Sequence, residues 1–129
     1  MIFVVREIAE LKQLGFDIEI ASINDSDRPQ DKLTHAEAAQ SAQTYYVKAH
    51  GIGGALAAHA NALFTRPRRY LRGWRNALSL AGLDMRALLL HAFYLTEALM
   101  VGRWMQRRQL VHLHVHLGSQ PATVGLLTK

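Results

Sequence analysis

Two hydrophobic periodicities follow one another in the first 23 residues. From Ile2 to Leu14, apolar side chains recur every three or four positions with charged side chains opposite them, which predicts an amphipathic helix. Gly15 stands where the end of a helix favours a positive φ angle. Residues 16–23 then alternate between apolar and polar side chains, and this alternation predicts a strand with one buried face.

The middle of the chain predicts mainly helices. Thr34 and Glu37 form a capping box for a short helix through Gln40, and Thr44–Val47 predicts a short strand. Three helices follow, the second of which begins at a proline, a residue that favours the first helical turn. These three helices are expected at residues 51–64, from Pro67 to about Ala81, and from a cap at Asp84 to Arg108.

The end of the chain predicts a second clear strand, Val111–His116, and a final helix that begins at Ser119 or Gln120 and runs to Thr128. Helices and strands thus alternate along the chain, which is typical of α/β proteins. We therefore expect an α/β fold with an incomplete Rossmann-like open parallel sheet and an inserted helical segment. Residues 1–129 are expected to form a single domain.

Charge is distributed unevenly along the 129 residues. Residues 1–59 hold five Lys/Arg and eight Asp/Glu, whereas residues 60–129 hold ten Lys/Arg and two Asp/Glu. This asymmetry predicts a face for an anionic partner: lipid headgroups, nucleic acid or a phosphorylated ligand. The chain contains no cysteine, which excludes disulfides, cysteine zinc ligands and a cysteine nucleophile.

Neither a secretory signal nor a membrane-spanning helix is predicted, because charged side chains interrupt each apolar stretch. The longest stretch, Met85–Val101, contains Arg86 and Glu97. It is also shorter than the ~20 apolar residues that span a bilayer.

Three histidines at alternate positions, His112, His114 and His116, are the most distinctive local feature. On a strand, period two would place all three imidazoles on one face, where they could bind zinc. No later carboxylate or histidine could complete such a site, so we expect no metal and interpret His112 and His114 as hydrogen-bonded sheet residues. His116 differs because it ends the strand, and open α/β sheets bind ligands beyond the carboxyl ends of their strands. A cleft role and a structural role for His116 both stay open.

Arginines cluster at the start of the helix that begins at Pro67. On a helical wheel, four of them occupy one arc of roughly 120°. They are Arg68, Arg69, Arg72 and Arg75, and the opposite arc holds Tyr70, Leu71, Trp74, Ala77, Leu78 and Ala81. Three interpretations remain open: a core-facing helix with a solvated basic side, a membrane-surface helix, or a nucleic-acid patch, which is the least favoured.

Two blocks of the sequence resemble family-4 glycosyltransferases. Residues 3–11, Phe-Val-Val-Arg-Glu-Ile-Ala-Glu-Leu, with Gly15 and the alternating residues after it, resemble the first helix and second strand of that family. Residues 112–124, His-Leu-His-Val-His-Leu-Gly-Ser-Gln-Pro-Ala-Thr-Val, are similar to its His-x-His-Phe stretch followed by Ala-Thr, with Leu117 in place of Phe. The basic helical region 66–108 also fits members that act on lipid-linked or polysaccharide acceptors.

The resemblance implies a GT-B enzyme that moves sugar, with retention, from a nucleotide sugar to a saccharide or lipid-linked acceptor. This chain would be its N-terminal, acceptor-side domain, without the first strand and the C-terminal donor domain, and inactive alone. His116 and the N–H groups of Gly118, Ser119 and Gln120 would line the substrate cleft, while no catalytic residue is assigned.

Besides the nucleotide-sugar donor, no cofactor is expected. The implied location is the cytoplasm, with peripheral attachment to the inner face of the membrane. Two alternatives of other classes are a non-catalytic basic module that binds a membrane or nucleic acid, and a metal-dependent hydrolase built on the three histidines.

Overall fold

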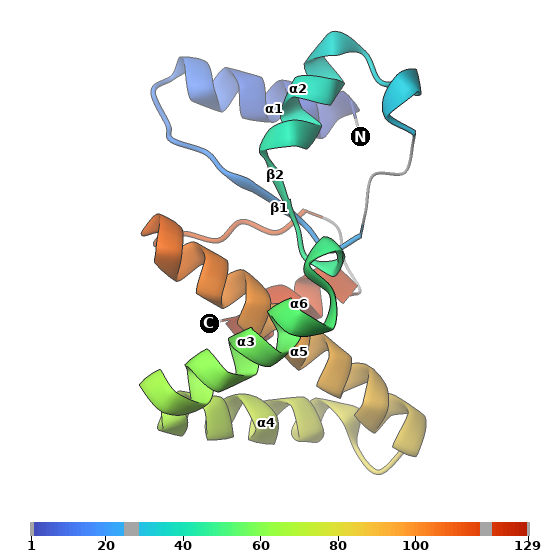
Figure 1. Cartoon of the computed structure of the whole chain (residues 1–129), viewed down its shortest axis with the longest axis vertical. Helices are drawn as coiled ribbons and strands as arrows, with labels where there is room; N and C mark the ends of the chain where they lie inside the picture. Colours follow the sequence, from blue (N-terminus) through green and yellow to red (C-terminus); the bar gives the residue numbers. More distant parts are fainter. Residues whose placement is uncertain (1, 25–28, 117–119, 129) are drawn as a thin grey trace. The chain divides into compact units, whose positions relative to one another are not determined.

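The computed structural model describes residues 2–24, 29–116 and 120–128, and it is mostly helical (Figure 1). The chain divides into two compact units. The first comprises residues 1–22 and 26–45, and the second comprises residues 23–25 and 46–129.

The first unit begins with α1 (Ile2–Gln13). Beyond its last residue the backbone turns at Gly15, whose φ of +91° is a conformation that side chains rarely adopt. The N–H of Phe16 donates to the carbonyl oxygen of Leu11 at 3.1 Å and closes this turn. The glycine predicted to end the first helix is therefore confirmed in that role.

A capping box starts α2 (His35–Gln43), which follows the short 3-10 helix η1 (Gln30–Lys32). The N–H of Glu37 donates to the hydroxyl oxygen of Thr34 at 3.3 Å, and the N–H of Thr34 donates to a carboxylate oxygen of Glu37 at 2.9 Å. The predicted cap is confirmed, and it satisfies two backbone donors that a helix start leaves unpaired.

Strand β1 (Ile20–Ser22) pairs with β2 (Thr44–Tyr46) in a two-stranded parallel sheet. The predicted strand at 44–47 is confirmed to within one residue. Of the strand predicted at 16–23, only the last part pairs with a neighbour; residues 16–19 precede it without regular structure.

Four α-helices make up most of the second unit, after the 3-10 helix η2 (Lys48–His50). The four helices are α3 (Gly51–Thr65), α4 (Pro67–Ala81), α5 (Met85–Arg108) and α6 (Gln120–Thr128). Asp84 caps α5 by accepting a hydrogen bond from the N–H of Arg86 at 3.0 Å. These helices, the proline start and the aspartate cap were all predicted and are confirmed.

The core of the second unit is centred on α5, which packs against α3, α4 and α6. Leu95 of α5 is only 1% exposed, and it is one of the two largest fully buried side chains in the described chain. Small residues let the neighbouring helices approach it: Ala58 and Ala77 are buried, and a Cβ atom on Gly73 of α4 would lie 3.1 Å from Cδ1 of Leu95. Close backbone approach thus takes the place of large interlocking side chains.

The expected Rossmann-like α/β fold is wrong. The structure is 74% helical, and within the described residues β1 and β2 form its only sheet. Residues 110–116, which include the predicted strand Val111–His116, have no regular secondary structure. A strand forms only where another strand supplies hydrogen-bond partners. Here the segment lies against α6 instead, since a Cβ on Gly125 would lie 2.5 Å from Cγ2 of Val115.

Candidate functional site

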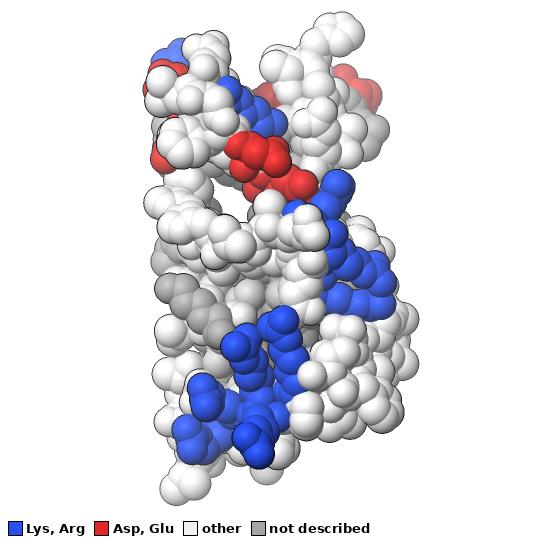
Figure 2. Space-filling model, turned by 90° about the vertical axis from the view of Figure 1, so that its left-hand side faces the viewer, with Lys and Arg blue, Asp and Glu red and all other residues white. Residues whose placement is uncertain are grey.

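The arginine arc, defined as Arg68, Arg69, Arg72 and Arg75, lies on the exposed side of α4. Figure 2 shows Lys and Arg side chains gathered over the end of the helical unit where α4 begins. Among the described residues, none forms an ion pair or hydrogen bond with these four guanidinium groups. The arc therefore presents four unneutralised positive charges on one helix face.

The opposite side of α4 packs into the unit only in part. Ala77 and Ala81 are buried, and Tyr70 and Trp74 are half-buried. Two leucines on the same arc are exposed instead, Leu71 by 64% and Leu78 by 49%.

Leu71, Arg68, Arg72 and Arg75 together line an open hollow on the surface. The exposed side of α4 is therefore mixed, with arginines and leucines side by side.

His59 of α3 connects three helices through its two ring nitrogens. Nδ1 lies 3.1 Å from the hydroxyl of Tyr70 on α4, and Nε2 lies 2.9 Å from the hydroxyl of Thr96 on α5. The Thr96 hydroxyl donates to the carbonyl oxygen of Ala92, so its oxygen accepts from Nε2–H, and Nδ1 accepts from Tyr70. This arrangement matches the hydrogen bonds of a neutral imidazole.

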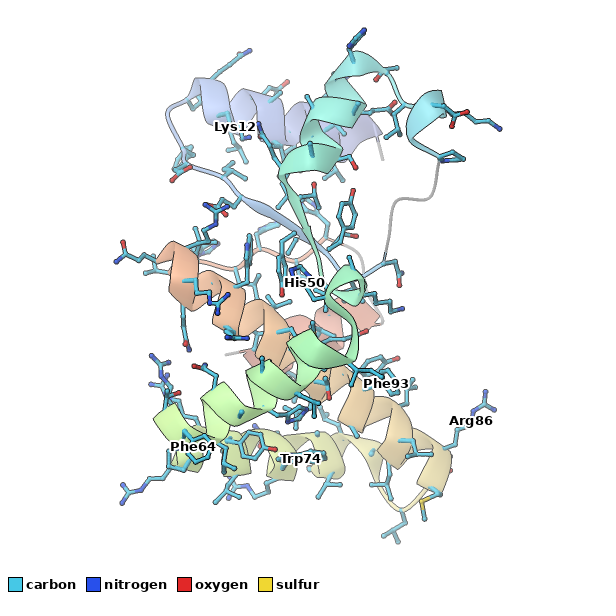
Figure 3. All side chains as sticks on the ribbon, viewed as in Figure 1. Lys12, His50, Phe64, Trp74, Arg86 and Phe93 are labelled. Atoms are coloured by element: carbon cyan, nitrogen blue, oxygen red, sulfur yellow. The ribbon has the colours of Figure 1, made fainter. Side chains whose placement is uncertain are left out.

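The hydrogen bonds of His59 to Tyr70 and Thr96 form a junction of three helices. Trp74 of α4 (Figure 3) stacks on the His59 ring at this junction. Burial lowers the pKa of His59 below its ordinary value, since the charged form is poorly solvated there. Sequence analysis missed this residue, whose only local signal is a polar side chain among the alanines of α3.

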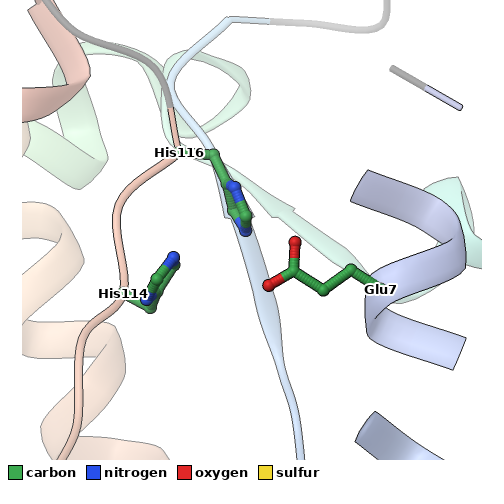
Figure 4. A group of neighbouring side chains, drawn as sticks. All are labelled: Glu7, His114 and His116. Carbon is green, nitrogen blue, oxygen red and sulfur yellow. The ribbon is translucent and has the colours of Figure 1, made fainter. Parts of the chain in front are cut away.

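His114 and His116 lie near each other in the second unit, with ring centroids 4.7 Å apart (Figure 4). His112 and His114 are exposed and His116 is half-buried. The interpretation of His112 and His114 as sheet residues is wrong, because their segment forms no strand. The cleft role of His116 loses its structural basis for the same reason and stays a prediction from the resemblance.

The other predicted cleft residues follow this segment. Gly118 and Ser119 lie outside the described residues, and Gln120 is the first residue of α6. Their predicted role as donors of N–H groups to a substrate stays a prediction.

By length and composition alone, α5 could cross a membrane, and it is the one such helix in the described part of the chain. Its most apolar window of 18 residues has a mean hydropathy of 1.2 and is 28% buried. The core helix of a soluble protein passes the same test, and α5 packs against three other helices, although several of its apolar side chains are exposed.

Comparison of the chain with protein-family models, curated proteins and solved structures finds no match. The resemblance to family-4 glycosyltransferases is therefore carried by its two residue blocks alone.

The junction at His59 makes the stability of the second unit dependent on pH. Its folded-state pKa lies below the unfolded value of about 6.5, so the unfolded chain takes up the proton more readily. The stability that this shift contributes is therefore fully present above about pH 6.5 and decreases as the pH falls through the lower folded-state pKa. We expect the urea midpoint of the wild type to fall on acidification more than that of His59→Gln, whose amide can still bond Tyr70 and Thr96. Parallel pH profiles for the two proteins would contradict this assignment.

Proposed function

We propose that this chain is the acceptor-side part of a glycosyltransferase that works on an anionic membrane surface, with α4 lying along that surface. The observation that carries the proposal is the exposed arginine arc of α4, opposite the helix face that packs into the core. A helix with one packed face and one cationic face is suited to the interface between water and lipid headgroups.

The electrostatics of the surrounding unit support this placement. Residues 46–129 carry eleven Lys/Arg and only two Asp/Glu, Asp84 and Glu97. Of these two acids, Glu97 is buried. Each basic residue near an anionic bilayer contributes about 1 kcal/mol, and the attraction decays over a Debye length of roughly 10 Å. Four arginines therefore provide reversible, salt-sensitive attachment without a spanning helix.

The leucines beside the arginines favour a bilayer over nucleic acid. Leu71 and Leu78 are exposed on the same helix as the arginine arc, and an acyl-chain boundary offers them an apolar environment. A phosphate backbone would satisfy the arginines but would give the leucines no apolar surface to contact.

The enzymatic half of the proposal is supported by the two residue blocks and by the local structure of the first block. In the first block, α1 ends at Gly15 and an extended segment leads to β1. In the second block, the extended residues 110–116 precede α6. A helix that leads into a strand is what the resemblance implies for the first block, whereas the second block has an irregular segment where the resemblance implies a strand.

In this proposal the acceptor is a saccharide or a lipid-linked saccharide collected from the membrane that α4 binds. His116 positions the acceptor, and a donor domain outside this sequence holds the nucleotide sugar. The arginine arc alone also supports a second candidate, a membrane-binding module without enzymatic activity.

Replacing the four residues of the arginine arc by glutamine tests the membrane half of the proposal. We expect the wild-type chain to co-sediment at low salt with vesicles that contain phosphatidylglycerol, and to be released at high salt. The glutamine variant should bind roughly 100-fold more weakly, because a few kcal/mol of attraction are lost. A variant with lysine at the same four positions keeps the charge and should bind like the wild type. Unchanged vesicle binding of the glutamine variant would contradict the proposed role of α4.

Two histidines provide a matched pair for the enzymatic half. In a protein that joins this chain to a donor-binding domain, His116→Ala should lower the kcat of sugar transfer by roughly 10- to 100-fold, because the acceptor is misplaced. His112→Ala, two positions earlier in the same segment, should reduce transfer only as far as it reduces the amount of folded protein. If both variants lose the same amount of transfer activity, and that loss equals their loss of folded protein, His116 has no functional role.

A further inference from the structure

Large apolar side chains surround the turn between α4 and α5. Six of them are exposed, and together they are called the apolar tip: Leu80, Leu83, Met85, Leu89, Leu90 and Phe93. Leu83 is 102% exposed, which means that none of its side-chain surface is covered by the unit. Burying such side chains is the dominant favourable term in folding and association, so an apolar tip left in water points to a partner surface.

The exposed apolar residues at the start of α5 lie along one side of that helix. Met85, Leu89 and Phe93 recur every four residues and form one stripe along the first turns of α5. Leu88 and Ala92, on another side of the same turns, are half-buried. Further along, α5 is buried among the other helices at Leu95. The start of α5 thus has one side in the unit and an apolar side in solvent.

The apolar tip also continues the cationic face of α4. On a helical wheel, Leu80 lies within about 20° of Arg69 at the edge of the arginine arc. At the start of α5, the side chain of Arg86 points outward from the helix (Figure 3). Asp84 is the only carboxylate between residues 80 and 93, and it accepts the capping hydrogen bond of α5. The surroundings of the tip therefore combine apolar side chains with positive charge.

We propose that the apolar tip inserts into the acyl boundary of an anionic bilayer while the arginine arc contacts the headgroups. This inference rests on the proposed attachment of α4 to a membrane and adds an apolar contact with the lipid to the electrostatic attraction. Leu83 and Met85 enter the apolar layer, and the long side chain of Arg86 reaches back to the phosphates. The positive charge beside the tip selects an anionic lipid surface over a second copy of this chain, whose own tip would carry the same charge.

The absence of cysteine from the sequence allows a site-specific test of insertion. A single cysteine at Leu83→Cys or at Val111→Cys can carry an environment-sensitive nitrobenzoxadiazole dye. Val111 is the matched control, because it is apolar, 99% exposed and part of the same unit. With vesicles that contain phosphatidylglycerol, we expect the dye at position 83 to shift its emission to the blue and to brighten several-fold. The dye at position 111 should not respond.

A second pair of variants measures the contribution of the tip to binding. Leu83→Asp combined with Leu89→Asp should lower vesicle binding at low salt by at least tenfold, because both leucines lose their apolar contact with lipid. Val111→Asp should bind like the wild type. All three positions are exposed, so circular dichroism should show the same helix content in every variant.

The outcomes separate this inference from the proposed function. If the glutamine variant of the arginine arc does not bind vesicles and the dye at position 83 shows no response on the same vesicles, insertion is overturned. The role of α4 is then still supported. Unchanged binding of that glutamine variant overturns the membrane role itself, whatever the dye reports. A dye response that appears without vesicles and rises with protein concentration assigns the tip to self-association and also overturns the inference.

Discussion

The packing of α5 against α3, α4 and α6 is the interaction on which the second unit depends. Leu95 lies at its centre, and Gly73 allows α4 to approach it closely. His59 adds a directional constraint, because its hydrogen bonds reach both α4 and α5 from α3. Apolar contact holds these helices together, and the imidazole fixes how they are rotated against each other.

This mode of packing leaves large side chains outside. The buried positions of α3 and α4 are alanines, whereas Leu71, Leu83 and Phe93 are exposed. Large apolar side chains left exposed in this way point to a partner surface, and the nearby arginines favour a partner with negative charge. The same sequence property of α3 and α4, alanines inside with leucines and arginines outside, thus supports both the helical unit and its proposed membrane surface.

Local signals in the sequence predicted the elements well, and the errors arose where distant segments decide the structure. The caps at Thr34 and Asp84 act within a few residues, so the sequence reveals them directly. The alternation at residues 111–116 is compatible both with a strand and with an irregular segment packed on α6. Only the presence of a neighbouring strand distinguishes these two structures. The exposure of Leu71 depends on where α3 and α5 lie beside α4. A helical wheel contains no information about the positions of neighbouring helices. The junction at His59 likewise requires partners 11 and 37 residues away.

Amide hydrogen exchange of the free and vesicle-bound chain tests the central claim most directly, because it reports on every helix at once. In the free chain, the slowest amides should lie near Leu95 in α5, and residues 111–116 should exchange quickly. Anionic vesicles should add protection to α4 and to the turn that contains Leu83, while residues 111–116 stay unchanged. Slow exchange of residues 111–116 in the free chain, as a sheet strand would give, or no added protection in α4 on vesicles, would contradict the account.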